Sequence, residues 1–264
     1  MISIKKLYLF FLTALLFLTF SRTFTVLFLT EAKTGFLIGS SKIVAVILLA
    51  LCGVVLLVLG FVAFVCEKRP NFVNKPSFVT GVWSFTVAIT IVAEVFIGFN
   101  SAFLLLSLFK ALFGLLSAFS FVLYGLWHFN RAKFYGVFFA PFVLYLVFSA
   151  VIIFTNYSAL AVISDHLFDV LVLCLFLLFF LEYSKMQSGI KIKSTRGLMA
   201  LGYTASCVAL ACQFSNYVCF VAGAKDALHN HNALSLSVMA VAVFIVLTLN
   251  DMCKKGSVVV EEQK

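Results

Sequence analysis

Charged residues are scarce in this chain of 264 residues. Asp, Glu, Lys and Arg together make up 11% of it, whereas an ordinary soluble domain carries about 25%. Hydrophobic residues make up 64%. This composition leaves too few polar side chains to cover the surface of a water-soluble domain of useful size.

The usual motifs of membrane enzymes and pumps are also missing. The sequence has no P-loop, no H-E-x-x-H, no G-x-S-x-G and no pair of intramembrane Asp residues on separate helices. His128 and His166 fall at the ends of apolar stretches on opposite sides of the membrane, which disfavours a bound haem. We therefore expect no cofactor, and an enzyme is the less favoured interpretation. The net charge of +9 is broken up by apolar stretches, so we expect no nucleic-acid partner.

Long apolar stretches fill most of the chain. Each is close to the ~20 residues that a helix needs to cross a bilayer, and each is apolar at both odd and even positions, unlike a barrel strand. The sequence predicts an all-α polytopic membrane bundle, with residues 1–264 forming a single transmembrane domain. The eight predicted spans are residues 7–29, 43–66, 78–99, 101–127, 134–155, 166–183, 197–222 and 233–249.

The basic residues predict how the spans are oriented. With eight spans, fourteen of the nineteen Lys and Arg residues fall on one side, three fall on the other, and Arg22 and Lys110 lie within spans. By the positive-inside rule both termini are cytoplasmic. We expect the protein to contact the lipid bilayer of the cell membrane. An alternative is that residues 1–21 are a signal peptide cleaved before Arg22, which would leave seven spans.

The cysteines and one proline give further expectations. All seven Cys lie in spans or at span ends, so we expect no disulfide. Cys66 and Cys253, near the predicted cytoplasmic ends, should react with thiol reagents faster than Cys52 and Cys174. Pro141 lies inside the fifth predicted span, where the missing N–H would kink a helix.

Polar side chains inside the predicted spans gather in the outer half of the membrane, and the inner half has almost none. A charged side chain in hydrocarbon is costly, so each of these side chains should have a partner of opposite charge or lie in a water-filled cavity. The residues that we expect to line a ligand site are Arg22, Glu94, Lys110, Asp169, Gln213 and Asn216.

Two ion pairs are predicted from this set. The third and fourth spans form a tight hairpin, so Glu94 and Lys110 can meet across it. By the same reasoning Arg22 is the natural partner of Asp169. Such pairs can serve only to dock helices, or they can line a cavity that opens to the outside.

A metal site is a weaker hypothesis. The predicted outer loop before the last span contains Asp226, His229 and His231, but an H-x-H on a loop is a weak signal and a solvated turn is the commoner meaning. Asp165 and His166 would complete a site only if the two outer loops approach each other. A membrane enzyme built around such a metal is the least favoured function.

The favoured function is binding, and translocation, of a small polar or zwitterionic solute through an outer-half cavity. No internal repeat or pair of broken helices supports a known transporter architecture. The alternative is a non-catalytic membrane subunit or sensor, whose protein partner would dock on the basic connection between Lys185 and Arg196. The positive-inside rule alone also explains why this cytoplasmic connection is basic.

Overall fold

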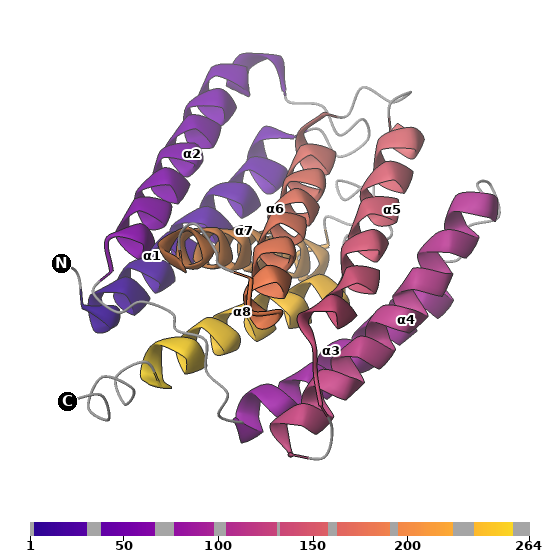
Figure 1. Cartoon of the computed structure of the whole chain (residues 1–264). Coiled ribbons are helices and arrows are strands. Elements are labelled where there is room, and N and C mark those ends of the chain that lie inside the picture. The colour runs from indigo at the N-terminus through magenta and orange to yellow at the C-terminus, as the bar shows by residue number, and fades with distance from the viewer. Residues whose placement is uncertain are drawn as a thin grey trace.

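The chain folds into eight long α-helices in the part that the structure describes (Figure 1). The structure is a computed structural model, and it describes residues 3–30, 38–66, 77–97, 104–130, 133–157, 163–190, 195–223 and 235–255. The helices are α1 (Ile4–Phe24), α2 (Lys42–Phe64), α3 (Phe78–Ile97), α4 (Leu104–His128), α5 (Ala140–Tyr157), α6 (Ile163–Gln187), α7 (Thr195–Val221) and α8 (Leu236–Lys255).

Each predicted span corresponds to one of these helices. Within the described residues, seven helices are long and apolar enough to cross a membrane, with α1 extended by the π-helical turn Thr25–Leu29. The eighth, α6, contains Asp169, Glu182 and Lys185 and packs between α5 and α7. The prediction of an all-α multi-pass membrane bundle is confirmed.

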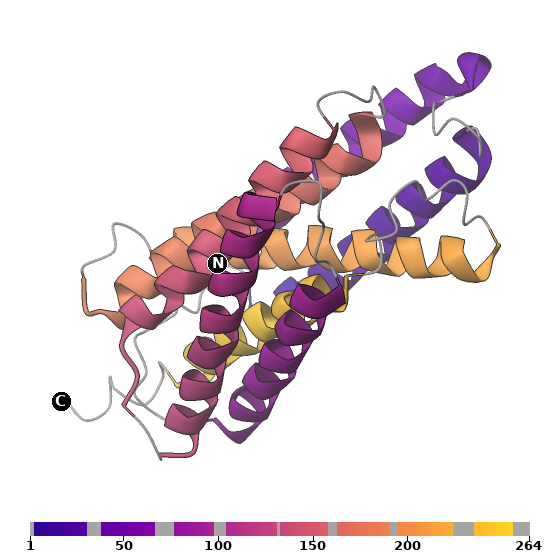
Figure 2. The same ribbon diagram turned by 90° about the vertical axis from the view of Figure 1, so that its right-hand side faces the viewer.

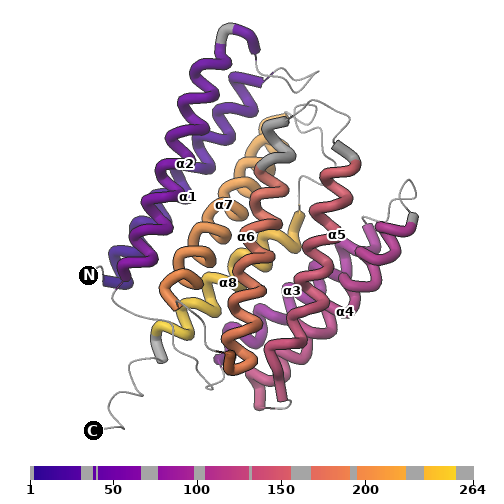
Figure 3. Tube along the Cα trace, turned by 45° about the horizontal axis from the view of Figure 1, so that its top comes forward, coloured from indigo at the N-terminus to yellow at the C-terminus, as the bar shows by residue number. Residues whose placement is uncertain are grey.

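Six of the helices form a closed ring. Neighbours along the chain contact each other from α3 through to α8, and α8 packs back against α3. The pair α1 and α2 stands outside this ring against α7, at the left of Figure 3. Figure 2 gives the view from the side, with α3 and α4 running next to each other. The ring surrounds an interior to which all six helices can contribute side chains.

Small residues on α7 allow this arrangement. The helix contacts α1, α2, α6 and α8, and it is the most buried of the seven membrane-spanning candidates. A Cβ at Gly202 would lie 2.5 Å from Leu249 Cδ1 and 2.8 Å from Phe179 Cε2. Small side chains at membrane interfaces let helix backbones approach closely, which is why α7 can be surrounded. By contrast α2 is the least buried, as expected of a helix that faces lipid.

Hydrogen bonds near the helix ends show which ends lie on the same side of the bundle. The Tyr8 hydroxyl near the start of α1 donates to Asn250 Oδ1 near the end of α8, at 2.5 Å. Thr80 at the start of α3 donates to Asp251 of α8. The start of α1 and the end of α8 therefore share one end of the bundle, which is the cytoplasmic end in the predicted orientation.

The first helix is part of the core. Leu7 and Phe11 are buried, and the Phe11 ring meets Tyr203 of α7 edge-on at 5.8 Å. Cleavage before Arg22 would remove these contacts. The signal-peptide alternative stays a prediction.

The expected kink at Pro141 is wrong. A 3₁₀ turn, Gly136–Phe139, precedes α5, and Pro141 is the second residue of that helix. The first backbone N–H groups of a helix have no partner within the helix, so a proline there costs nothing and its fixed φ suits the helix.

The end of the bundle that holds Asn250 also contains polar contacts that the sequence analysis did not predict. The Tyr124 and Tyr183 hydroxyls are hydrogen-bonded at 2.6 Å, and Gln187 Nε2 donates to Tyr183 at 2.8 Å. In addition, α8 continues past residue 249 and brings Asn250 and Asp251 into a helix. Buried tyrosines usually find a partner for the hydroxyl, although they count as hydrophobic in a composition.

The cysteine expectations are half right. All seven cysteines are free, which agrees with the prediction of no disulfide. However, Cys66 and Cys253 are buried, whereas Cys174 is exposed on the outside of the bundle. We now expect small, lipid-soluble methylmercury to modify Cys174 first in the folded protein, and Cys66 and Cys253 only after unfolding. Site-resolved mass spectrometry measures this order. Rapid modification of Cys253 in the native protein would contradict the packing of α8.

Candidate functional site

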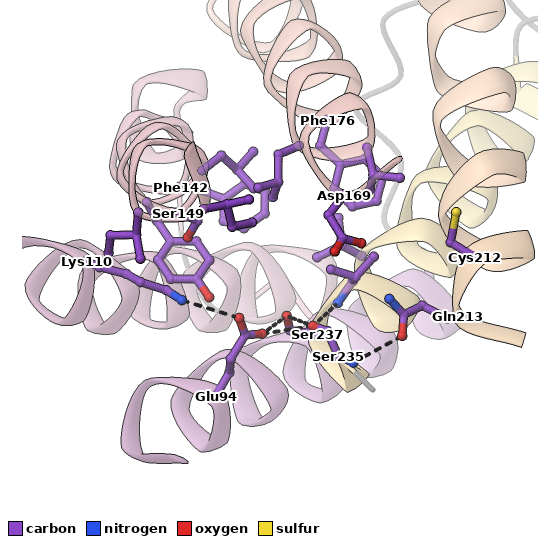
Figure 4. A pocket seen from close by; sticks show the side chains of 18 residues that line it. Glu94, Lys110, Phe142, Ser149, Asp169, Phe176, Cys212, Gln213, Ser235 and Ser237 are labelled. Carbon is purple, nitrogen blue, oxygen red and sulfur yellow. Dashed lines mark hydrogen bonds and ion pairs between the residues drawn. The ribbon is translucent and has the colours of Figure 1, made fainter. Parts of the chain in front are cut away.

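A cavity lies inside the six-helix ring, at the end opposite Asn250. Its volume is about 120 Å³, measured as the space open to the centre of a water molecule. All six helices of the ring, or residues next to them, contribute to its wall, as Figure 4 shows for the labelled side chains. The polar residues in the wall are Glu94, Lys110, Tyr145, Ser149, Asp169, Gln213, Ser235 and Ser237.

Glu94 is the centre of the polar contacts. Lys110 Nζ lies 3.7 Å from Glu94 Oε1, so the predicted contact across the α3–α4 hairpin is present. The Ser235 hydroxyl donates to Glu94 Oε2 at 3.1 Å, and the Ser237 hydroxyl donates to the same oxygen. A direct charge-assisted N–H···O bond is about 2.8 Å long, so the ion pair is looser than a hydrogen bond. A water molecule or a polar group of a ligand could compete for either partner.

The start of α8 is tied into the same cluster. Ser235 Oγ accepts a hydrogen bond from Val238 N at 3.3 Å, which is the N-cap contact that satisfies a free N–H at the start of a helix. Gln213 Oε1 accepts from Ser235 N at 3.1 Å. The cap of α8, the amide on α7 and the carboxylate on α3 therefore hold one another in place.

Two buried hydroxyls of α5 lie close to this cluster. Tyr145 and Ser149 are buried, and the Tyr145 hydroxyl lies near those of Ser149 and Ser237. The Tyr145 hydroxyl is close enough to interact electrostatically with Glu94, and Lys110 Nζ lies 5.8 Å from the centre of the Tyr145 ring. A hydroxyl can both donate and accept a hydrogen bond, so Tyr145 and Ser149 can also bind a solute or water in the cavity.

An aromatic cluster lies between the cavity and the end of the bundle that holds Asn250. Phe142 lines the cavity, and its ring meets Phe121 edge-on at 5.0 Å. Phe121 also meets Phe139, Phe180 and Phe244 edge-on, at 5.7, 6.1 and 5.3 Å. These five side chains are at most 1% exposed. These tightly packed rings lie next to the cavity on that side.

The structure brings together four of the six residues expected at the site. Glu94, Lys110, Asp169 and Gln213 line the cavity, whereas Asn216 is buried in α7 and is not among its lining residues. Arg22 lies in the wall of a second cavity, with its guanidinium 4.8 Å from the centre of the Phe168 ring. The pair of Arg22 with Asp169 therefore stays a prediction.

Sequence reasoning missed Ser235 and Ser237. They fall inside the eighth predicted span, residues 233–249, but only ionisable and amide side chains within the spans were assigned to the site. A serine pair at the start of a predicted helix is a capping signal, and it could have shown that this helix begins beside the other polar groups.

The metal hypothesis falls outside the described structure. Asp226, His229 and His231, together with the side chains of Asp165 and His166, lie outside the described residues. Among the residues that are described, no three His, Cys, Asp or Glu side chains gather as metal ligands would.

The cavity combines a carboxylate and an ammonium group, a second carboxylate, an amide and several hydroxyls, all within a bundle of apolar helices. Such a site can bind a polar molecule by charge and hydrogen bonds, because the surrounding low dielectric strengthens both. Comparisons with models of known protein families, with curated proteins and with solved structures find no match, so what this cavity does has to be inferred from its own geometry.

Proposed function

We propose that this protein binds a small zwitterionic solute in the cavity of the six-helix ring, as a step in moving that solute across the cell membrane. The observation that carries the proposal is the position of Glu94, Lys110, Asp169 and Gln213 around one cavity, although they come from four different helices. Groups of both signs suit a ligand with both an amine and a carboxylate. The amine would meet Glu94 or Asp169, and the carboxylate would meet Lys110.

The volume limits the ligand to a small molecule. The 120 Å³ would hold on the order of ten water molecules, at roughly 10–15 Å³ of such space for each, or one solute of comparable bulk. A small amino acid is of this size. The predicted orientation places the polar cluster at the outer end, so the solute would enter from outside. Passage inward would require the aromatic cluster around Phe121 to separate.

Equilibrium binding of radiolabelled glycine, alanine and serine to the purified protein in nanodiscs tests the proposal. We expect saturable binding of at least one of the three. Asp169→Asn should weaken it tenfold or more, because it removes a charge from the cavity wall without changing the shape of the side chain. Glu182→Gln is the matched control, since Glu182 lies on the same helix and pairs with exposed Lys185 away from the cavity. No saturable binding by the wild type, or equal binding by Asp169→Asn, would overturn the proposal.

The alternative of a subunit or sensor gains no specific support. Lys185 Nζ lies 2.7 Å from Glu182 Oε1 on its own helix, and the Arg196 guanidinium lies 6.0 Å from the centre of the Phe64 ring on α2. Both basic residues therefore interact within the bundle. A protein partner docked between them stays a prediction.

A further inference from the structure

The side-chain amide of Gln213 has hydrogen-bond donors that no residue in the described part of the chain uses. Gln213 lies on α7, lines the polar cavity and is only 3% exposed. Its Oε1 accepts a hydrogen bond from Ser235 N at 3.1 Å, whereas its Nε2 makes no hydrogen bond to any described residue. Buried polar groups nearly always have a partner, so these N–H groups in the wall of a cavity point to an occupant with an acceptor.

The orientation of this amide follows from its hydrogen bond with Ser235. A backbone N–H can only donate, so the atom that faces Ser235 N is the amide oxygen. The amide nitrogen then lies on the other side. In Figure 4 it points away from Ser235, toward the part of the wall that carries Asp169. Because Ser235 also caps α8, the donor is held in place before a solute arrives, and less freedom is lost on binding.

Lys110 and Gln213 lie at opposite ends of one chain of contacts. Lys110 faces one carboxylate oxygen of Glu94, and the Ser235 hydroxyl donates to the other. The backbone of Ser235 in turn contacts Gln213. Figure 4 shows the same order across the cavity, with Glu94 between Lys110 and Gln213. A solute whose carboxylate meets Lys110 therefore presents another of its groups to Gln213.

The Glu94–Lys110 pair matches the end that all amino acids share. In an amino acid the ammonium and the carboxylate are joined through one carbon, so they lie as close together as the two side chains of this pair. The 3.7 Å between Lys110 Nζ and Glu94 Oε1 is longer than a charge-assisted hydrogen bond, which leaves both groups able to bind a solute. With the shared end of the amino acid at this pair, the side chain of the solute extends toward Gln213.

Asp169 adds a second requirement at the Gln213 end. It lines the same cavity and lies on the Gln213 side of Glu94 in Figure 4. A carboxylate has about four acceptor sites, so Asp169 can accept a hydrogen bond from a solute in addition to contacts within the protein. It would repel a second carboxylate. A solute group that both accepts and donates fits Gln213 and Asp169 together, and the neutral groups of this kind are the hydroxyl and the primary amide.

We propose that the polar cavity selects amino acids whose side chain carries a hydroxyl or a primary amide, with serine and asparagine as the smallest examples, and that Gln213 is the residue that selects them. This inference rests on the proposed function. The side-chain oxygen of the solute accepts from Gln213 Nε2, and its O–H or N–H donates to Asp169. Alanine leaves the Gln213 amide without a partner, and aspartate brings a negative charge toward Asp169.

Equilibrium binding of four radiolabelled amino acids to the wild-type protein in nanodiscs tests the selection. Serine should bind about tenfold more tightly than alanine, because alanine leaves a buried donor unpaired. Asparagine should exceed aspartate, which has nearly the same shape, by at least as much. Equal affinity within either pair would overturn the selection and leave the cavity as a general amino-acid site. If none of the four binds saturably, the proposed function fails and this inference fails with it.

A variant of Gln213 separates selection from structure. Gln213→Met keeps the length of the side chain and removes the amide, so serine should bind about tenfold more weakly while alanine, which does not use the amide, changes little. Gln187→Met is the matched control and should keep the preference for serine, because Gln187 donates to Tyr183 at the far end of α6 from Asp169. Equal losses of serine and alanine binding in Gln213→Met would mean that Gln213 only holds the start of α8, and would overturn its assignment. The comparison of the four amino acids on the wild type does not depend on how this variant folds.

Discussion

Replacing Glu94 with Gln should lower the free energy of unfolding by about 3 kcal/mol, since it leaves the Lys110 ammonium facing a low-dielectric cavity without its counter-charge. The structure makes Glu94 the more important partner of the pair. It accepts hydrogen bonds from Ser235 and Ser237 as well as the ion pair, whereas the contacts of Lys110 described above are with Glu94 and the face of the Tyr145 ring. Lys110→Met should therefore cost less, about 2 kcal/mol, because two hydroxyls continue to hold the carboxylate.

The double variant separates pairing from function. Glu94→Gln combined with Lys110→Met removes both charges and should recover much of the lost stability, because no unpaired charge is left in the membrane. Unfolding in a titration of sodium dodecyl sulfate measures all three variants. The exposed pair Glu182 and Lys185 supplies the control, and its removal should change the stability by less than about 1 kcal/mol.

The double variant has three possible outcomes, and each decides what the Glu94–Lys110 pair does. Additive losses in the double variant would show that the two side chains do not interact, and the positions of α3 and α4 would then be wrong. A double variant that folds and binds the solute like the wild type would make the pair purely structural. If it folds but no longer binds, the charges serve the ligand.

The Glu94–Lys110 contact could be predicted because short-range geometry determines it. Only a few residues join α3 to α4, so the register of the hairpin follows from the sequence, and the cost of an unpaired charge in lipid supplies the reason for contact. Asp169 and Gln213 were grouped with this pair only because their predicted depths are similar. Polar groups at one depth can share a cavity only if their helices are neighbours. The ring of helices makes them neighbours.

Arg22 shows where this reasoning fails. Its predicted depth in the membrane matches that of the other charged residues, but depth does not determine which helices surround α1. Contacts between distant parts of the chain place α1 outside the ring, against α7 and α2. The inner hydrogen bonds between Tyr124, Tyr183 and Gln187 were missed for a related reason, because nothing local to any one helix shows that two tyrosine hydroxyls meet.

The two cavities differ in a way that follows from these positions. Six helices surround the ring interior, so polar groups there can meet each other, water or a solute. The space between α2 and α7 opens at the side, where exposed Val46 and Leu49 would lie in lipid. Cys212 of α7 lines both cavities and separates them.

Phe121→Ala should also lower the free energy of unfolding by about 3 kcal/mol. It should open a path between the polar cavity and the end of the bundle that holds Asn250. Phe121 is fully buried and meets four other rings edge-on, so its removal leaves a void that those neighbours cannot fill without moving. Stability is measured by the same detergent titration. Leakage is measured by the collapse of a pH gradient across liposomes that contain the variant and an internal pH-sensitive dye.

Phe119 provides the matched control on the same helix. It is 60% exposed on the outer surface of the bundle, so Phe119→Ala should change neither stability nor leakage by much. Phe121→Leu, which keeps most of the buried volume, should restore the seal and part of the stability. Equal losses from Phe119→Ala and Phe121→Ala would mean that α4 is rotated from its described position. If Phe121→Ala is less stable yet its liposomes stay tight, the aromatic cluster contributes to packing but does not form the barrier below the cavity, and a solute bound there must take another route inward.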